Sequence, residues 1–192
     1  MHSQPRREHL IETAAALFNE HGYHATGIDT IMQVSGVSKT TLYKYFSSKE
    51  ELILEVLRRR HEESMQYFRD YVDRSKQSCP DSQEERHILA VFDALHDLIN
   101  SDHFYGCNFI NASAEYNDSG DAINAVAASH KKALSQFITG LLTEKSSAKR
   151  KGLADQVLII LDGAIISAQV RHDKKAAQKA KQAVRKLLGL DE

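Results

Sequence analysis

Apolar residues recur along most of the chain at the three- and four-residue spacing of amphipathic helices, which predicts an all-α protein. The first such stretch, about Pro5 to His21, places Leu10, Ala14, Leu17 and Phe18 on one helical face. Prolines number only two and glycines nine, so the residues that punctuate strands and turns are scarce. We therefore expect about nine helices and no sheet.

A different pattern occupies the segment Gly36 to Leu52, which reads GVSKTTLYKYFSSKEEL. Gly36 supplies the permissive backbone of a short turn between helices, and Ser38 is a good N-cap for the helix that follows. Val37 and Leu42 are predicted to point inward. The side chains left on the outside are Lys39, Thr40, Thr41, Tyr43 and Lys44.

These outward side chains suit contact with DNA. Lysine reaches phosphates or guanine edges, threonine reaches a phosphate or a thymine methyl group, and the tyrosine hydroxyl bonds phosphate oxygens. Residues 39–49 carry three lysines and no acidic residue, a local charge of +3. Charge alone leaves a solvated helix surface open as an alternative. The glycine turn, the cap and the aromatic spacing favour a helix-turn-helix that reads DNA.

The helices on either side of this segment complete the expected reading domain. A short helix from about Gly27 to Ser35 precedes the turn, and a long helix follows it from Ser48 to about Asp73. Ser48 and Glu51 have the spacing of a capping box. At 1.5 Å per residue the long helix spans roughly 38 Å, so we expect it to belong to both halves of the molecule.

The middle of the chain predicts a loop followed by three more helices. Ser75 to Glu85 is polar around Cys79 and Pro80, which is typical of a loop. The expected helices are about His87 to Asn100, a short one from near Asn108, and about Asp118 to Glu144.

The C-terminal section is apolar on several helical faces, which indicates a helix buried on more than one side. In a chain of this size the simplest extra partner is a second copy, so we predict a dimer through this helix and the last one, about Lys174 to Leu188. Leu161→Arg is expected to give a folded monomer. The predicted interface residues are Leu153, Val157, Ile160, Leu161, Ala164, Ile165, Ala168, Ala180, Val184 and Leu187.

Composition agrees with a globular cytoplasmic protein. Of the 192 residues, 42% are hydrophobic and 27% charged, and the formal net charge is −1. That charge is uneven: residues 1–60 carry +1, residues 61–148 carry −7 and residues 149–192 carry +5. DNA affinity must therefore come from a local patch. We expect no membrane span, no signal peptide and no disulfide between the two cysteines.

The segment Thr26 to Leu52, TGIDTIMQVSGVSKTTLYKYFSSKEEL, resembles the DNA-binding signature of the TetR/AcrR family of transcriptional regulators. Gly27 stands where the family usually has a Ser or Thr cap, and Met32 where it has a small residue. The resemblance makes Ser38 to Phe46 the recognition helix and Lys49 a phosphate contact. The predicted DNA contacts are Thr26, Ser38, Lys39, Thr40, Thr41, Tyr43, Lys44, Tyr45 and Lys49.

The resemblance also implies a division of labour along the chain. Residues 1–48 would form the DNA-binding domain and residues 49–192 the ligand-binding and dimerisation domain, with helix 49–73 shared. It implies a dimeric repressor that a small organic effector releases from a palindromic operator. Candidate effector-binding residues are Met65, Phe68, His96, Phe104, Cys107, Asn108 and Asn111.

Two alternatives remain at this point. One is a DNA-binding regulator of the same fold without an effector. The other is a thiol-dependent enzyme that uses Cys107 and a nearby histidine such as His96 or His103, since a cysteine and a histidine are the parts of a nucleophilic pair. The sequence contains no glycine-rich phosphate loop and no metal-ligand spacing, so we expect no enzyme activity, no metal and no cofactor.

Overall fold

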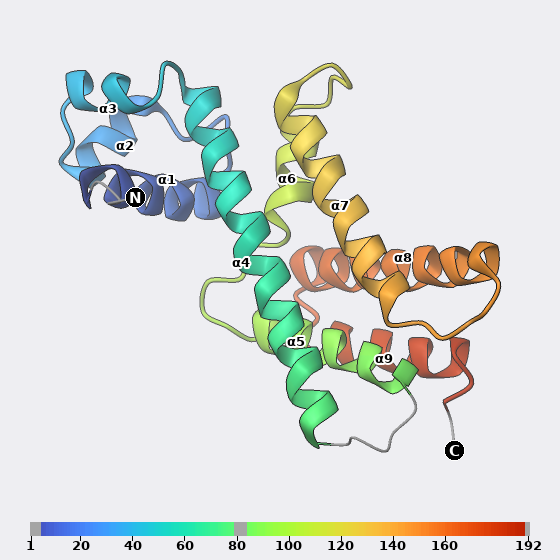
Figure 1. Cartoon of the computed structure of the whole chain (residues 1–192). Helices are drawn as coiled ribbons and strands as arrows, with labels where there is room; N and C mark the ends of the chain where they lie inside the picture. Colours follow the sequence, from blue (N-terminus) through green and yellow to red (C-terminus); the bar gives the residue numbers. More distant parts are fainter. Residues whose placement is uncertain (1–4, 79–83, 191–192) are drawn as a thin grey trace. The chain divides into compact units, whose positions relative to one another are not determined.

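The computed structural model describes residues 5–78 and 84–190, and within these ranges the chain is helical and contains no strand (Figure 1). The elements are α1 (Pro5–His21), α2 (Ile28–Ser35), α3 (Lys39–Tyr45), α4 (Lys49–Ser78), the 3₁₀ turn η1 (Glu84–Ile88), α5 (Leu89–Ile99), α6 (Asn108–Glu115), α7 (Ala122–Gly140), α8 (Ser147–Arg171) and α9 (Ala176–Leu187). In the described part of the chain, nine α-helices confirm the predicted all-α fold.

The long helix α4 is longer than predicted. It continues to Ser78 where the sequence indicated a loop from Ser75 onward. The Ser78 hydroxyl donates to the carbonyl of Arg74 at 2.9 Å, one helical turn back. Polar composition was therefore a poor signal here, because neither glycine nor proline interrupts the segment before Pro80. The rest of the predicted loop up to residue 83, with Cys79, lies outside the described residues.

Helix α7 is shorter than predicted, beginning at Ala122 instead of near Asp118. The residues before it form a turn in which the Asp118 carboxylate accepts from the Gly120 N–H at 2.9 Å. The Asp121 carboxylate then accepts from the Ile123 N–H at 2.7 Å, which satisfies an amide of the first helical turn. Short aspartate side chains thus hold the backbone in a turn up to this point.

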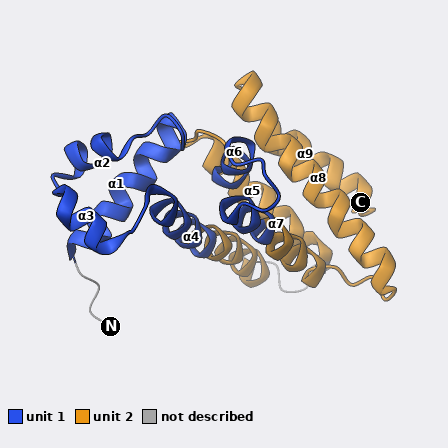
Figure 2. Cartoon of the chain, turned by 90° about the horizontal axis from the view of Figure 1, so that it is seen from above, with its two compact units in different colours: residues 1–62, 107–130 blue, residues 63–106, 131–192 orange. Residues whose placement is uncertain are grey.

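The described chain divides into two compact units (Figure 2). Unit 1 consists of residues Met1–Glu62 and Cys107–His130. Its core joins α1, α2, α3 and the first half of α4 to α6 and the first half of α7, and its buried side chains include Leu10, Phe18, Ile31, Leu42, Phe46, Leu52, Phe109 and Ile123. Helices α1, α2 and α3 therefore share one apolar core with a segment from the middle of the sequence.

A histidine pair links α4 to α7 inside unit 1. The Nδ1 atoms of His61 and His130 lie 3.0 Å apart, so one donates to the other. The buried ring of His130 also stacks on Phe109, with centroids 3.6 Å apart and planes 7° from parallel.

Unit 2 consists of residues Glu63–Gly106 and Lys131–Glu192. Within it α5, α8 and α9 pack on one another. Polar contacts join α5 to the C-terminal end of the chain: the Lys181 ammonium lies 2.6 Å from the Asp93 carboxylate, and Lys174 Nζ donates to the Ile99 carbonyl at 2.8 Å.

Helices α4 and α7 each contribute to both units. The packing units differ from the domain division expected at residue 48, because α6 and the start of α7 share the core of α1, α2 and α3. The expected roles of residues 49–192 in effector binding and dimerisation stay predictions.

Candidate nucleic-acid interface

Helix α3 is fixed at both ends by local interactions. Gly36 ends α2 in the left-handed conformation, with φ of 66°, and so turns the chain toward α3. Ser38 has extended backbone and its hydroxyl accepts from the Thr41 N–H at 3.3 Å, as predicted for an N-cap. At the other end Phe46 leaves the helical conformation while its N–H still donates to the Leu42 carbonyl at 3.0 Å.

The two faces of α3 differ sharply in burial. Leu42 is 0% exposed and Val37 is buried beside it, as the sequence predicted. The outward face consists of Lys39, Thr40, Tyr43 and Lys44, all exposed and spaced i, i+1, i+4, i+5 along the helix. Two further predicted contacts, Thr41 and Tyr45, are half-buried, and Tyr45 packs against the unit 1 core.

The structure does not place Thr26 with these residues. Its side chain is only 2% exposed, and its hydroxyl donates to the Gly22 carbonyl at 2.7 Å. Thr26 therefore closes the turn after α1, and we leave its side chain out of the contact set. Lys49 is half-buried at the start of α4, where its Nζ donates to the His24 carbonyl at 3.3 Å.

The start of α4 contains one half of the predicted capping box. The Ser48 hydroxyl accepts from the Glu51 N–H at 3.2 Å. The Glu51 carboxylate, however, accepts from the N–H and the hydroxyl of Ser47, both at 2.6 Å, instead of from Ser48. These hydrogen bonds from Ser47 hold the pKa of Glu51 below its usual value.

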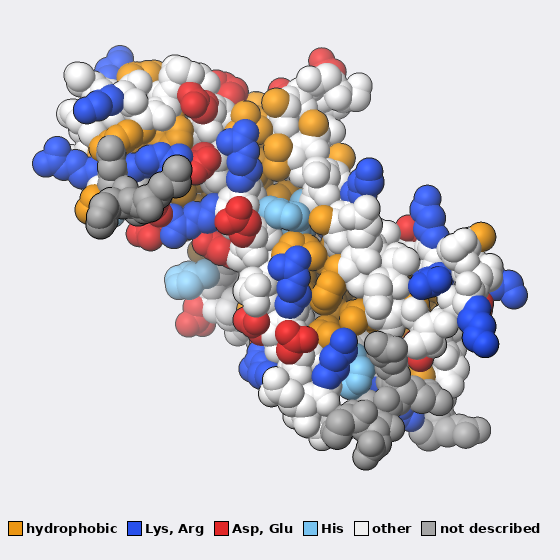
Figure 3. Space-filling model, in the orientation of Figure 1, with side chains coloured by type: hydrophobic (Ala, Val, Ile, Leu, Met, Phe, Trp, Pro, Cys, Tyr) orange, Lys and Arg blue, Asp and Glu red, His pale blue; other side chains and the backbone are white. Residues whose placement is uncertain are grey.

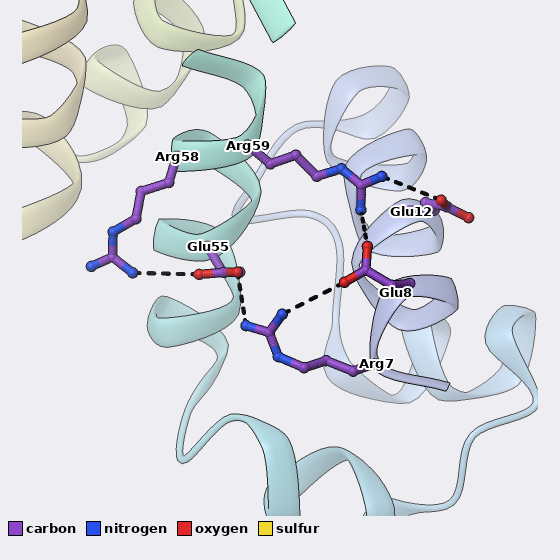
Figure 4. Close-up of polar contacts among 6 residues, drawn as sticks. All are labelled: Arg7, Glu8, Glu12, Glu55, Arg58 and Arg59. Atoms are coloured by element: carbon purple, nitrogen blue, oxygen red, sulfur yellow. Dashed lines mark hydrogen bonds and ion pairs between the residues drawn. The ribbon is translucent and has the colours of Figure 1, made fainter. Parts of the chain in front are cut away.

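Ion pairs between α1 and α4 occupy several of the arginines of unit 1 (Figure 4). Arg7 lies 2.7 Å from Glu55, and its guanidinium also sits over the Phe46 ring. Arg59 lies 2.6 Å from Glu8 and 3.4 Å from Glu12. These ion pairs join the start of α1 to α4.

Glu115 at the end of α6 holds the loop between α1 and α2, and no local sequence signal indicated this role. Its carboxylate accepts from the Tyr23 N–H at 2.9 Å and the His24 N–H at 2.5 Å. Gly22 has φ of 86°, and a Cβ there would lie 3.0 Å from the same carboxylate. The partners are separated by about ninety residues of sequence, so only the tertiary fold brings them together.

Tyr23 fastens the other end of α6 to the same loop. Its hydroxyl donates to the Asn108 carbonyl at 3.1 Å, and its ring stacks on Phe18. Burial, followed by the nearby Cys107 and Glu115, raises the pKa of the Tyr23 phenol well above its ordinary value. The phenol therefore stays protonated and remains a hydrogen-bond donor.

The predicted effector-binding residues are divided between the units. Met65 and Phe68 are buried in unit 2, and Phe104 is half-buried there. His96, also in unit 2, has its ring nitrogens near Asn100 at 3.2 Å and Gln178 at 3.4 Å. The other three, Cys107, Asn108 and Asn111, are half-buried in unit 1. A shared site for all seven stays a prediction.

Most residues of the predicted dimer interface are buried within the chain itself, and the interface stays a prediction. Leu161 is 0% exposed, and the other interface predictions that are buried within the chain are Val157, Ala164, Ile165, Ala168, Ala180 and Val184. Leu153, Ile160 and Leu187 are half-buried. A helix apolar nearly all round gives no sequence signal for which face packs inward.

The exposed apolar residues of α8 form a different stripe. Ile159 is 70% exposed, Ile166 39% and Val170 69%, and Gly163 lies between them with open space around its Cα. Their spacing of four, three and four residues places them on one face.

By length and composition alone, helix α8 is also long and apolar enough to cross a membrane. A core helix passes the same test, and α8 packs on α5 and α9. One such helix is weak evidence for a membrane span.

The geometry around α3 defines a helix-turn-helix protein: a buried scaffold presents a capped helix with a polar outer face. Comparison with known proteins identifies the family. Residues 10–56 match the model described as bacterial regulatory proteins, tetR family. The solved structure of SCO4454, a TetR-family transcriptional regulator from Streptomyces coelicolor, has a TM-score of 0.83 and 27% identity, over 96% of this chain and 89% of that one.

Two curated relatives match the N-terminal half. The transcriptional activator FasR of Mycolicibacterium smegmatis is 39% identical over 98 residues, which are 50% of this chain and 42% of FasR. The transcriptional repressor KstR2 of Mycobacterium tuberculosis is 36% identical over 90 residues, 47% of this chain and 44% of KstR2. The chain thus spans less than half the length of these relatives. It belongs to the TetR family of helix-turn-helix transcriptional regulators.

Proposed function

We propose that the protein is a cytoplasmic, dimeric transcriptional repressor that binds a palindromic operator and leaves it when a small organic effector binds. The observation that carries the proposal is the exposed polar face of α3, Lys39, Thr40, Tyr43 and Lys44, on a helix fixed by caps and a buried leucine. Such a helix fits the major groove, where these side chains reach base edges and phosphates.

The local positive charge of residues 39–49 supports DNA binding by α3, whereas the net charge of the whole chain, −1, does not. On the face drawn in Figure 3, Lys and Arg side chains are interspersed with Asp and Glu. The three lysines of residues 39–49 are free of acidic sequence neighbours within that segment. We therefore assign DNA affinity to this patch and infer a binding protein, not an enzyme.

The second copy of the chain is proposed to pack on the exposed stripe of α8, Ile159, Gly163, Ile166 and Val170. Covering exposed isoleucine and valine side chains on one helical face removes apolar surface from water, which is favourable. Gly163 permits close approach of two helices. A two-fold dimer presents its recognition helices about 34 Å apart, or a multiple of that distance, so the operator is expected to be a palindrome.

The contacts of α6 support a route from an effector to the DNA-binding residues within unit 1. Glu115 holds the loop of Tyr23 and His24, and the His24 carbonyl accepts from Lys49, a proposed phosphate contact. An effector that shifts α6 would move this loop. To change occupancy substantially it must favour one state by a few kcal/mol.

The test is selection of DNA fragments by the purified full chain, followed by footprinting of the selected site. We expect a protected palindrome, and weaker, less selective protection by Thr40→Ala. Binding without sequence preference would contradict a reading role for α3. A thermal-shift screen followed by operator release then separates an effector-responsive repressor from a regulator of the same fold without an effector.

A further inference from the structure

A groove of ≈ 470 Å³ lies beside the recognition helix within unit 1. The start of α1 forms one wall, and the α2–α3 turn with the first turn of α3 forms the other. Its size falls within the roughly 300–1,000 Å³ typical of binding pockets. The lining residues are Pro5, Arg6, His9, Ser35, Gly36, Val37, Ser38 and Thr41.

The chemistry of the groove suits an anion. Among its described lining residues Arg6 carries a positive charge and none is acidic. His9 joins the two walls: its Nε2 lies 3.1 Å from the Ser35 carbonyl, and since a carbonyl only accepts, the ring nitrogen donates. The hydroxyls of Ser38 and Thr41 add further polar groups to the opposite wall.

Arg6 differs from its neighbour Arg7 in what it contacts. Arg7 is paired with Glu55 and lies over Phe46, so it serves the packing of α1 on α4. Arg6 is exposed and lines the groove. Arg7 therefore serves the fold, whereas the guanidinium of Arg6 lies at a surface that an anion can reach.

The groove is continuous with the proposed DNA surface. Ser38 and Thr41 belong both to its lining and to the predicted DNA contacts. The space beside Gly36 in the groove is empty, since a Cβ built on this residue would meet no atom within 4 Å. A sugar-phosphate backbone passing the start of α3 can thus approach the turn closely.

We propose that this groove seats a phosphodiester group of the operator strand that flanks the bases read by α3. The Arg6 guanidinium binds its oxygens, and the Ser38 and Thr41 hydroxyls lie on the opposite wall. The footprint of each reading domain then extends beyond α3 to the start of α1. This inference rests on the proposed function and adds a contact that the sequence reading missed.

The test compares Arg6→Gln with Arg58→Gln in the full chain. Both remove one positive charge from unit 1, but Arg58 is exposed on α4, where its guanidinium lies 3.5 Å from Glu55. Operator affinity is measured between 50 and 200 mM salt. We expect Arg6→Gln to weaken binding about fivefold to tenfold at the low end and to reduce the slope of log affinity against log salt by about one. Arg58→Gln should leave the slope unchanged, and Arg6→Lys should restore it.

Phosphate ethylation interference locates the contact. One or two ethylated phosphates that weaken binding of the wild-type chain should have no effect on Arg6→Gln, while the pattern across the α3 site persists. An unchanged salt slope and interference pattern for Arg6→Gln would overturn the proposed groove contact even though the wild-type chain binds its operator. A wild-type chain that selects no operator would instead refute the proposed function.

Discussion

Helices α3 and α8 show how differently one sequence specifies two surfaces. In α3 the polar and apolar residues separate cleanly, and both the buried Leu42 and the exposed Lys39, Thr40, Tyr43 and Lys44 lie where the pattern predicts. In α8 most faces are apolar, and the face chosen from the sequence is the one that the chain buries itself.

The difference teaches where helical periodicity carries information. A hydrophobic stripe identifies the inward face only when the opposite face is polar. On α8 both the face that packs in the core and the face proposed to contact a second copy are apolar. Periodicity therefore does not distinguish burial within the chain from burial against a partner. Substitutions on the two faces of α8 can tell these two kinds of burial apart, and substitutions at Glu115 and Ser38 test what holds the DNA-binding helices in place.

The largest effect is expected from Leu161→Arg on the buried face of α8. Leu161 is fully enclosed, so the charged side chain loses its hydration without gaining a partner. We expect a loss of about 4 kcal/mol or more of unfolding free energy, measured by urea denaturation followed by circular dichroism. A stable, folded monomer, which the sequence alone predicted, would show that Leu161 faces a second copy after all.

Ile159→Arg on the opposite face should act on assembly instead. Ile159 is largely exposed within one chain, so helical content should be retained. We expect the dimer mass to halve in analytical ultracentrifugation. Operator affinity should fall on the order of 100-fold, because the second reading domain is no longer tethered. An intact Ile159→Arg dimer would exclude this stripe as the interface.

Glu115→Ala tests the long-range support of the reading domain. It removes a charged acceptor from the Tyr23 and His24 amides, and hydrogen bonds to charged groups contribute about 1.5–3 kcal/mol. We expect a loss in that range, with faster hydrogen exchange at these two amides. Glu115→Gln, which keeps an acceptor oxygen, should lose less. Equal stability of the wild type and both variants would show that the clamp contributes nothing.

Ser38→Ala should lower stability less than Glu115→Ala. It removes the hydroxyl that caps α3, at a cost of about 1 kcal/mol. Thr40→Ala, two residues further along and exposed, is the matched control and should change stability by less than about 0.5 kcal/mol. Thermal unfolding of both variants measures the contrast. A larger loss from Thr40→Ala would mean that α3 is oriented differently.

Prediction from the sequence succeeded where residues close along the chain decide the structure. The bounds of α1, the glycine turn after α2 and the Ser38 cap all follow from neighbouring residues. It failed at the end of α4, where polar residues indicate a loop but the helix continues, and at the start of α4, where Glu51 bonds Ser47 instead of completing the box with Ser48. Competing local partners of similar chemistry cannot be ranked from the sequence.

The sequence by itself determined that this chain is all-helical and carries a capped helix with a polar outer face, because both depend on contacts within a few residues. The tertiary structure decided which face of α8 is buried, that Glu115 holds the loop of Tyr23 and His24, and that Arg6 lines a groove beside Ser38. Each of these features joins residues from separate segments of the chain. Which segments pack together is set by the whole core, and no local pattern encodes it.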